Sequence, residues 1–212
     1  MLQIKKVETI YKHSYFSFAG TLVAATIVFF LFQPVAQKNI LILWFLSFVI
    51  FTFIRFIISW RFDNNEHSDT DIEHWFILFS ACSIISGMFW GITGFILIPG
   101  DDFPLLESVI FRGCLLLFIS ALITGAIITY STSKTIFLSF AVPAIIPQCL
   151  YLIHIGDKYH SMLGGIILLY VTIIYIVSIY INRIFISYTK LEIENELLKS
   201  FITKKGFKIK SY

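Results

Sequence analysis

The chain has 212 residues, of which 58% are hydrophobic and only 14% are charged. A soluble domain carries roughly 25% charged residues, so this composition excludes a soluble enzyme, a nucleic-acid-binding domain and a disordered chain. The net charge of +3 is also too small to indicate a polyanionic partner. The composition therefore predicts a protein whose first partner is the lipid bilayer, and the positions of its few charges become informative.

Long stretches without Asp, Glu, Lys or Arg divide the chain into segments of membrane-spanning length. A helix that crosses the hydrocarbon core of a bilayer needs roughly 20 apolar residues, and continuous apolar runs favour helices over the alternating strands of a barrel. We expect an all-α fold, a polytopic bundle of about six transmembrane helices; a split or re-entrant segment would change that number. The predicted spans are residues 14–33, 39–60, 75–98, 108–130, 135–153 and 161–182.

Lys and Arg are distributed unevenly between the two sides of these spans. With the N-terminus inside, 13 of the 16 Lys and Arg residues lie on the cytoplasmic side, against Lys38, Arg112 and Lys158 outside. The positive-inside rule then predicts a multi-pass protein of the bacterial cytoplasmic (inner) membrane with both termini in the cytoplasm. The first span follows three lysines, as a signal peptide would, but it is too long for one and lacks a good cleavage site. We therefore expect it to be retained.

Side chains near the span ends are expected to meet the membrane surface. Arg55 and Arg112 are the charges nearest to span interiors, and long Arg side chains reach the interface from such positions. The alternative is that one of them is a counter-ion for an anionic ligand. Aromatic residues towards the span ends are typical of the membrane–water interface: Trp44, Trp60, Trp75 and Tyr130.

Cysteines and histidines give no strong signal for a cofactor or a metal site. The three cysteines, Cys82, Cys114 and Cys149, lie inside predicted spans without C-x-x-C spacing and are expected to be small apolar residues. His67 and His74 accompany five acidic residues in one loop, which predicts a solvated loop, with a divalent-cation site as the alternative. His154 and His160 flank the turn at residues 156–158, where a pH or metal sensor is the alternative to a plain polar turn. We expect no cofactor.

Small residues and prolines indicate how the helices pack. Gly87, Gly91 and Gly94 follow one another at about one-turn intervals in the third span. Glycines at this spacing let two helix backbones approach closely, and we expect them to pack inside the bundle. In the fifth span, Pro143 and Pro147 each remove a backbone donor and kink the helix. A functional hinge there is the alternative to a structural kink.

The segment after the last predicted span is polar but keeps a helical pattern. We divide the chain into a transmembrane domain, residues 1–183, and a cytoplasmic amphipathic or coiled-coil tail, residues 184–212. Alternating intervals of four and three predict a heptad seam that would support a homodimer, with an Asn that fixes register. A helix lying on the membrane surface, favoured by the tail's lysines, is an equal alternative. The seam residues are Ile184, Tyr188, Leu191, Asn195, Leu198 and Ile202.

Four features occur together along residues 8–200: Trp60-Arg61 closing the second span, FWGITGF at 89–95 running into Ile98-Pro99, the paired prolines of the fifth span, and LEIENELL at 191–198. This combination resembles the N-terminal multi-pass membrane sensor region of bacterial hybrid histidine kinases and diguanylate cyclases. In that family the tail helix continues into a kinase or GGDEF-type catalytic domain. We find no phosphoacceptor helix, ATP-binding domain or GGDEF-type sequence. The resemblance therefore implies an input module without its output, and no catalytic residue is carried over.

These observations favour a non-enzymatic, sensor-like membrane protein, either truncated or acting on a separate kinase or cyclase partner through helix movement. A small transporter or channel subunit is the alternative that the glycines and prolines suggest. A membrane enzyme or an inactive remnant is the third hypothesis. Catalysis is disfavoured because the predicted spans lack paired carboxylates and a Ser/His pair.

Overall fold

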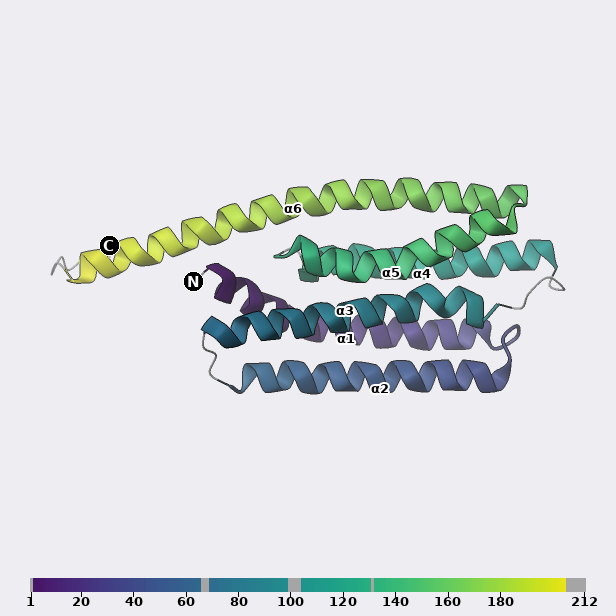
Figure 1. Ribbon diagram of the computed structural model, residues 1–212, viewed down its shortest axis with the longest axis horizontal. Helices are drawn as coiled ribbons and strands as arrows, with labels where there is room; N and C mark the ends of the chain where they lie inside the picture. Colours follow the sequence, from purple (N-terminus) through teal and green to yellow (C-terminus); the bar gives the residue numbers. More distant parts are fainter. Residues whose placement is uncertain (1, 66–68, 99–103, 131, 205–212) are drawn as a thin grey trace, which may run out of the picture.

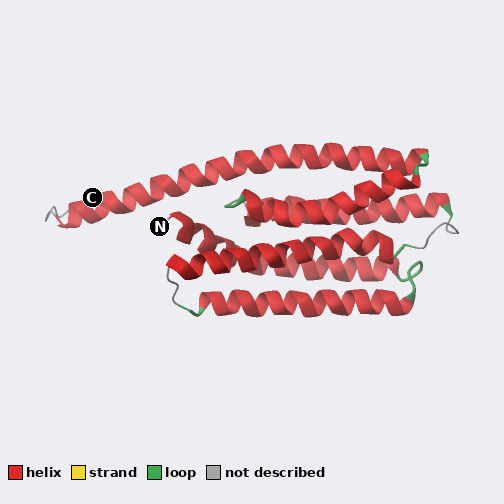
Figure 2. Ribbon diagram, in the orientation of Figure 1, coloured by secondary structure: helices red, strands yellow, loops and turns green. Residues whose placement is uncertain are grey.

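The structure is a computed structural model that describes residues 2–65, 69–98, 104–130 and 132–204. Within these residues every regular element is a helix (Figure 2). All six helices are long and apolar enough to cross a membrane, so the predicted all-α membrane bundle is confirmed. They are α1 (Leu2–Phe32), α2 (Lys38–Asp63), α3 (Asp69–Ile96), α4 (Leu105–Tyr130), α5 (Lys134–Ile155) and α6 (Lys158–Lys204).

The helices lie roughly parallel to one long axis and form four tiers (Figure 1). The helix α2 is one outer tier, α1 and α3 form the next, α4 and α5 the third, and α6 the other outer tier. Successive helices alternate in direction, so both described ends of the chain lie at the same end of the bundle. We call this the termini end, and the other the far end.

Aromatic side chains fill the middle of the bundle. Trp90 is fully buried on α3, where its ring lies 4.9 Å from that of Phe48 and 6.1 Å from that of Trp44. Nearer the termini end, Tyr11 stacks on Phe62 with ring centroids 4.0 Å apart. Such pairs stabilise a bundle beyond simple apolar burial, and they join α1, α2 and α3.

Two residues connect α5 to α6 at the far end. Gly156 has a φ of 78°, a left-handed conformation that glycine adopts freely and that commonly ends a helix. Asp157 then caps α6, because its Oδ1 accepts hydrogen bonds from the amides of Tyr159 (2.9 Å) and His160 (3.1 Å). The end of α5 and the capped start of α6 are therefore separated by this two-residue turn alone.

The helix α6 is a single helix of 47 residues, which at 1.5 Å per residue is about 70 Å long. It continues unbroken across residues 183 and 184, where we placed the boundary between the transmembrane domain and the tail. Its last turns extend beyond the other helices at the termini end (Figure 1). The predicted span and tail thus share one continuous helix.

Candidate functional site

The closest helix contact lies between α3 and α5, and the glycine triad of α3 makes it. A β-carbon added at Gly87 would overlap the Phe140 carbonyl, and one at Gly91 would overlap the carbonyl of Pro143. A β-carbon at Gly94 would overlap the Gln148 side chain. The three predicted packing residues therefore face α5 inside the bundle, Gly87 and Gly91 against its backbone and Gly94 against the Gln148 side chain.

The two prolines of α5 face this same contact. Pro143 and Pro147 lie inside α5, which bends on its way to α6 (Figure 1), and their side chains lie beside Gly87 and Gly91 respectively. Gln148, one residue further on, donates a hydrogen bond of 2.6 Å from Nε2 to the Gly91 carbonyl. A polar clamp thus ties α5 to α3 just beyond the prolines, towards the far end.

Arg112 organises a polar network at the far end. Its side chain, from α4, is only 4% exposed. It donates to the carbonyl of Gly94 (3.2 Å) and, through Nε, to Ser108 (3.2 Å). Gly94 lies in the last turn of α3, where carbonyls have no partner within the helix and the helix dipole favours a cation. The charge of Arg112 is therefore matched to a helix C-terminus.

The network continues to the start of α6. The Ser108 hydroxyl lies 3.3 Å from Nε2 of the buried His160, whose Nδ1 contacts the Asp157 carboxylate. Burial disfavours the charged form of Asp157 and would raise its pKa. Hydrogen bonds from His160 and from the Tyr159 amide favour the charged form more strongly, so the pKa of Asp157 lies below its usual range. The network links α3, α4 and α6 at the turn that joins α5 to α6.

Arg55 forms a second network, nearer the termini end. Its side chain, from α2, is also 4% exposed. It donates to Ser86 Oγ on α3 (2.8 Å) and to the Tyr130 hydroxyl on α4 (3.2 Å). The Tyr130 hydroxyl lies 3.4 Å from Ser17 Oγ on α1, so the network joins four helices.

Both guanidinium groups lie over aromatic rings, that of Arg112 over Tyr151 (4.7 Å), but Arg55 donates only to hydroxyls within the described ranges. Its guanidinium lies over the rings of Phe18 (4.8 Å) and Phe79 (5.8 Å). Among the described residues, neither a carboxylate nor a backbone carbonyl is among its hydrogen-bond and ring partners. A charge buried among hydroxyls and rings is costly, and in membrane proteins such a residue is a candidate functional site. We take the Arg55 network as the centre of the candidate site.

The structure corrects the expectations for side chains near the span ends. The prediction that Arg55 and Arg112 extend to the membrane surface is wrong, because both point into the bundle. The same holds for two of the aromatic residues: Trp44 is buried and donates to Thr93 Oγ1 (3.1 Å), and Tyr130 is buried beside Arg55. Position along a span indicates depth, but the helix face that meets a neighbour decides which way a side chain points.

Ser86 and Ser17 were missed by the sequence analysis. They lie on α3 and α1 without a motif around them, and single serines are common in membrane helices. The sequence feature that could have indicated them is Arg55 itself, since a charge inside an apolar helix needs polar partners on the neighbouring helices.

The described histidines and cysteines do not come together in a shared site. Within the described residues no group of three His, Cys, Asp or Glu side chains is close enough to hold a metal ion. His67, which belonged to the predicted polar loop, lies outside the described residues. Cys82, Cys114 and Cys149 are free thiols on three different helices.

The predicted seam on α6 faces away from the bundle. Leu191 and Leu198 are each 59% exposed, whereas Thr189 on the opposite face is only 3% exposed. The last turns of α6 are held by α1, because Lys5 Nζ lies 3.0 Å from Glu196 and 3.8 Å from Glu192. All six seam residues are exposed: Ile184, Tyr188, Leu191, Asn195, Leu198 and Ile202.

Comparisons of this chain with protein-family models, with curated proteins and with solved structures return no significant match. The chain is therefore described from its own residues as a six-helix membrane protein.

Proposed function

We propose that the chain is a signal-input protein of the bacterial inner membrane, with both termini in the cytoplasm, that passes helix movement through α6 to a second copy and on to a kinase or cyclase partner. The observation that carries the proposal is the continuity of α6. One helix runs from the far-end network along the whole bundle and carries an exposed heptad seam over residues 184–202.

A route for movement into α6 is built into α5. Pro143 and Pro147 weaken the hydrogen-bond ladder of α5, and only two residues, Gly156 and Asp157, separate α5 from α6. A change in the packing of α5 on α3 would therefore move the start of α6. Because α6 is a continuous helix, that movement would reach the seam.

The seam has the pattern of a parallel two-stranded coiled coil. Leu191 and Leu198 occupy d positions, and Asn195 occupies the a position that fixes register in such dimers. Since a heptad seam packs against its equivalent in a second chain, the exposed seam supports a homodimer through α6.

Disulfide crosslinking in membranes tests the proposal. The three native cysteines are replaced by alanine, and a single cysteine is introduced by Leu191→Cys or Leu198→Cys. Thr189→Cys is the matched control, because that position faces the chain's own bundle. We expect a crosslinked dimer at 191 and at 198 and little at 189. Absence of crosslinks at both seam positions, or equal crosslinking at all three, would remove the dimer and with it the proposed route.

A further inference from the structure

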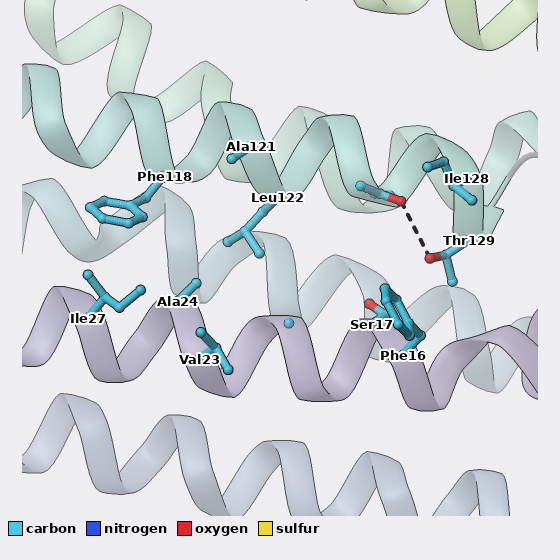
Figure 3. A pocket seen from close by; sticks show the side chains of 13 residues that line it. Phe16, Ser17, Val23, Ala24, Ile27, Phe118, Ala121, Leu122, Ile128 and Thr129 are labelled. Atoms are coloured by element: carbon cyan, nitrogen blue, oxygen red, sulfur yellow. Dashed lines mark hydrogen bonds between the residues drawn. The ribbon is translucent and has the colours of Figure 1, made fainter.

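An open groove runs between α1 and α4 beside the Arg55 network (Figure 3). Its volume is about 310 Å³, at the lower end of the roughly 300–1,000 Å³ of ordinary ligand sites. The walls are almost entirely apolar, with Ile27, Phe118 and Leu122 among them. The only side-chain hydroxyls that line it are those of Ser17 and Thr129, and both lie at the end of the groove nearest the termini.

Two glycines keep the groove open. Gly20 on α1 and Gly125 on α4 both line it, and no atom lies within 4 Å of where a β-carbon would be on either residue. The helices α1 and α4 are antiparallel, so Ser17 lies beside Tyr130 and Ile27 beside Phe118. The groove spans residues 16–27 of α1, about 17 Å at 1.5 Å per residue. One leaflet of the hydrocarbon core is about 15 Å thick, so the groove is about as long as one leaflet is thick.

The surface end of the groove is basic. Lys12 is exposed one turn before Phe16, on the face of α1 that lines the groove, and the exposed Lys134 opens α5 four residues after Tyr130. Arg55 lies behind this end, joined to the groove-lining Ser17 through Tyr130. The next acidic residue along α1, Glu8, lies two turns beyond Phe16. Two exposed lysines therefore lie at the termini end of the bundle, where a lipid headgroup would lie, and the carboxylate of Asp63 on α2 accepts a hydrogen bond from Tyr15 in this part of α1 (2.7 Å).

We infer that the α1–α4 groove binds one acyl chain of an anionic glycerophospholipid from the leaflet at the termini end. The acyl chain would lie along Gly20 and Gly125, an ester oxygen would accept a hydrogen bond from Ser17, and the phosphate would lie near Lys12 and Lys134. The length of the groove matches one leaflet, and the charge at its mouth is complementary to an anionic headgroup. In the proposed input protein, this lipid would be the ligand that the Arg55 network senses. The sensing role rests on the proposed function, whereas lipid binding can be measured independently of it.

Photolabelling tests the inference. The full chain is placed in phosphatidylcholine nanodiscs that contain phosphatidylglycerol with a diazirine on one acyl chain, and labelled peptides are mapped by mass spectrometry. We expect labels concentrated in residues 16–27 and 118–129. Gly125→Leu fills the groove without meeting another atom at its β-carbon and should reduce labelling at least about fivefold. The matched control is Gly113→Leu, on the same helix and also with open space at its β-carbon but outside the groove, and it should leave labelling unchanged.

The headgroup part is tested with Lys12→Gln and Lys134→Gln. A lysine near the surface attracts an anionic lipid by about 1 kcal/mol, so each variant should reduce labelling by phosphatidylglycerol about fivefold. Lys38→Gln, at the far end, is the control. Equal labelling of the groove by a photoreactive phosphatidylcholine would overturn the anionic headgroup. Uniform labelling along all helices, or no effect of Gly125→Leu, would overturn the groove as a lipid site, as would crosslinks showing that a helix of a second copy fills it.

Failure of lipid binding and failure of the proposed dimer are distinguishable. Labelling should persist in a Leu191→Lys/Leu198→Lys variant, which breaks the seam but leaves the groove untouched. Loss of labelling in that variant would overturn a groove formed within one chain.

Discussion

Two pairs of helices in this bundle meet through glycines, with opposite results. Between α3 and α5, the glycines at 87, 91 and 94 bring the backbones together until there is no room for a β-carbon. Between α1 and α4, Gly20 and Gly125 face open space and leave a groove. Glycine in a membrane helix therefore permits close approach but does not enforce it.

Other contacts decide which result each pair reaches. At the α3–α5 contact, Gln148 donates to the Gly91 carbonyl and ties α5 to α3, and Arg112 ties α4 to the end of the same helix α3. At the α1–α4 pair, the polar link from Ser17 through Tyr130 to Arg55 lies at one end only. Further along α4, the Ser120 carbonyl and the Thr124 hydroxyl face the other side of the helix, where both contact the Tyr170 hydroxyl of α6. The closed contact serves as a structural anchor, and the open one is suited to a ligand.

The largest expected effect separates the glycines of the two contacts. Gly91→Ala places a methyl group against the Pro143 carbonyl, which is backbone and cannot turn aside, so α3 and α5 must move apart. We expect a loss of about 3 kcal/mol in the free energy of unfolding, measured by unfolding in detergent micelles. Gly125→Ala, the matched control, should lose nothing and can gain up to about 1 kcal/mol from helix propensity. Similar losses for the two variants would show that the α1–α4 groove is closed.

A smaller effect separates the two arginines. Arg112→Met removes a donor from the Gly94 carbonyl and from Ser108, and leaving such groups unpaired in the interior costs about 1–3 kcal/mol. Arg55→Met also removes a donor, from the Ser86 and Tyr130 hydroxyls, but hydroxyl groups can rotate to other partners and the cost of burying an unpaired charge is removed. We expect Arg112→Met to be the less stable variant by about 1–2 kcal/mol in the same unfolding measurement. The reverse order would contradict the view that Arg112 anchors the structure while Arg55 is kept at a cost.

The smallest effect concerns pH and the far-end network. Because the pKa of folded Asp157 lies below its ordinary value of 3.8, the stability it contributes is fully present above that value and is lost as the pH falls through the folded pKa. We expect the free energy of unfolding to fall below about pH 4. Asp157→Asn keeps a good helix cap but loses the carboxylate, so it should cost less than about 1 kcal/mol near neutral pH and reduce the acid dependence. An acid dependence identical to that of the unchanged chain would contradict this role.

The spans were predictable because each is a long apolar run between charges, and a charge is too costly to leave in lipid. The glycine triad was predictable as a packing surface because its spacing places it on one face of α3. The direction of Arg55 was not predictable, since it depends on which face of α2 meets α3 and α4. The groove was hidden for the same reason: Gly20 is isolated in the sequence, and Gly125 directly follows Thr124, whose hydroxyl contacts Tyr170 of α6 instead of the groove.

The most direct test of the proposed function is a cysteine scan along α6. Single cysteines are placed at each residue from 184 to 202 in the chain whose native cysteines are alanine, and crosslinking is measured in membranes. The account predicts maxima at 184, 188, 191, 195, 198 and 202, with minima on the face that carries Thr189. A flat profile, or maxima on the Thr189 face, would contradict it.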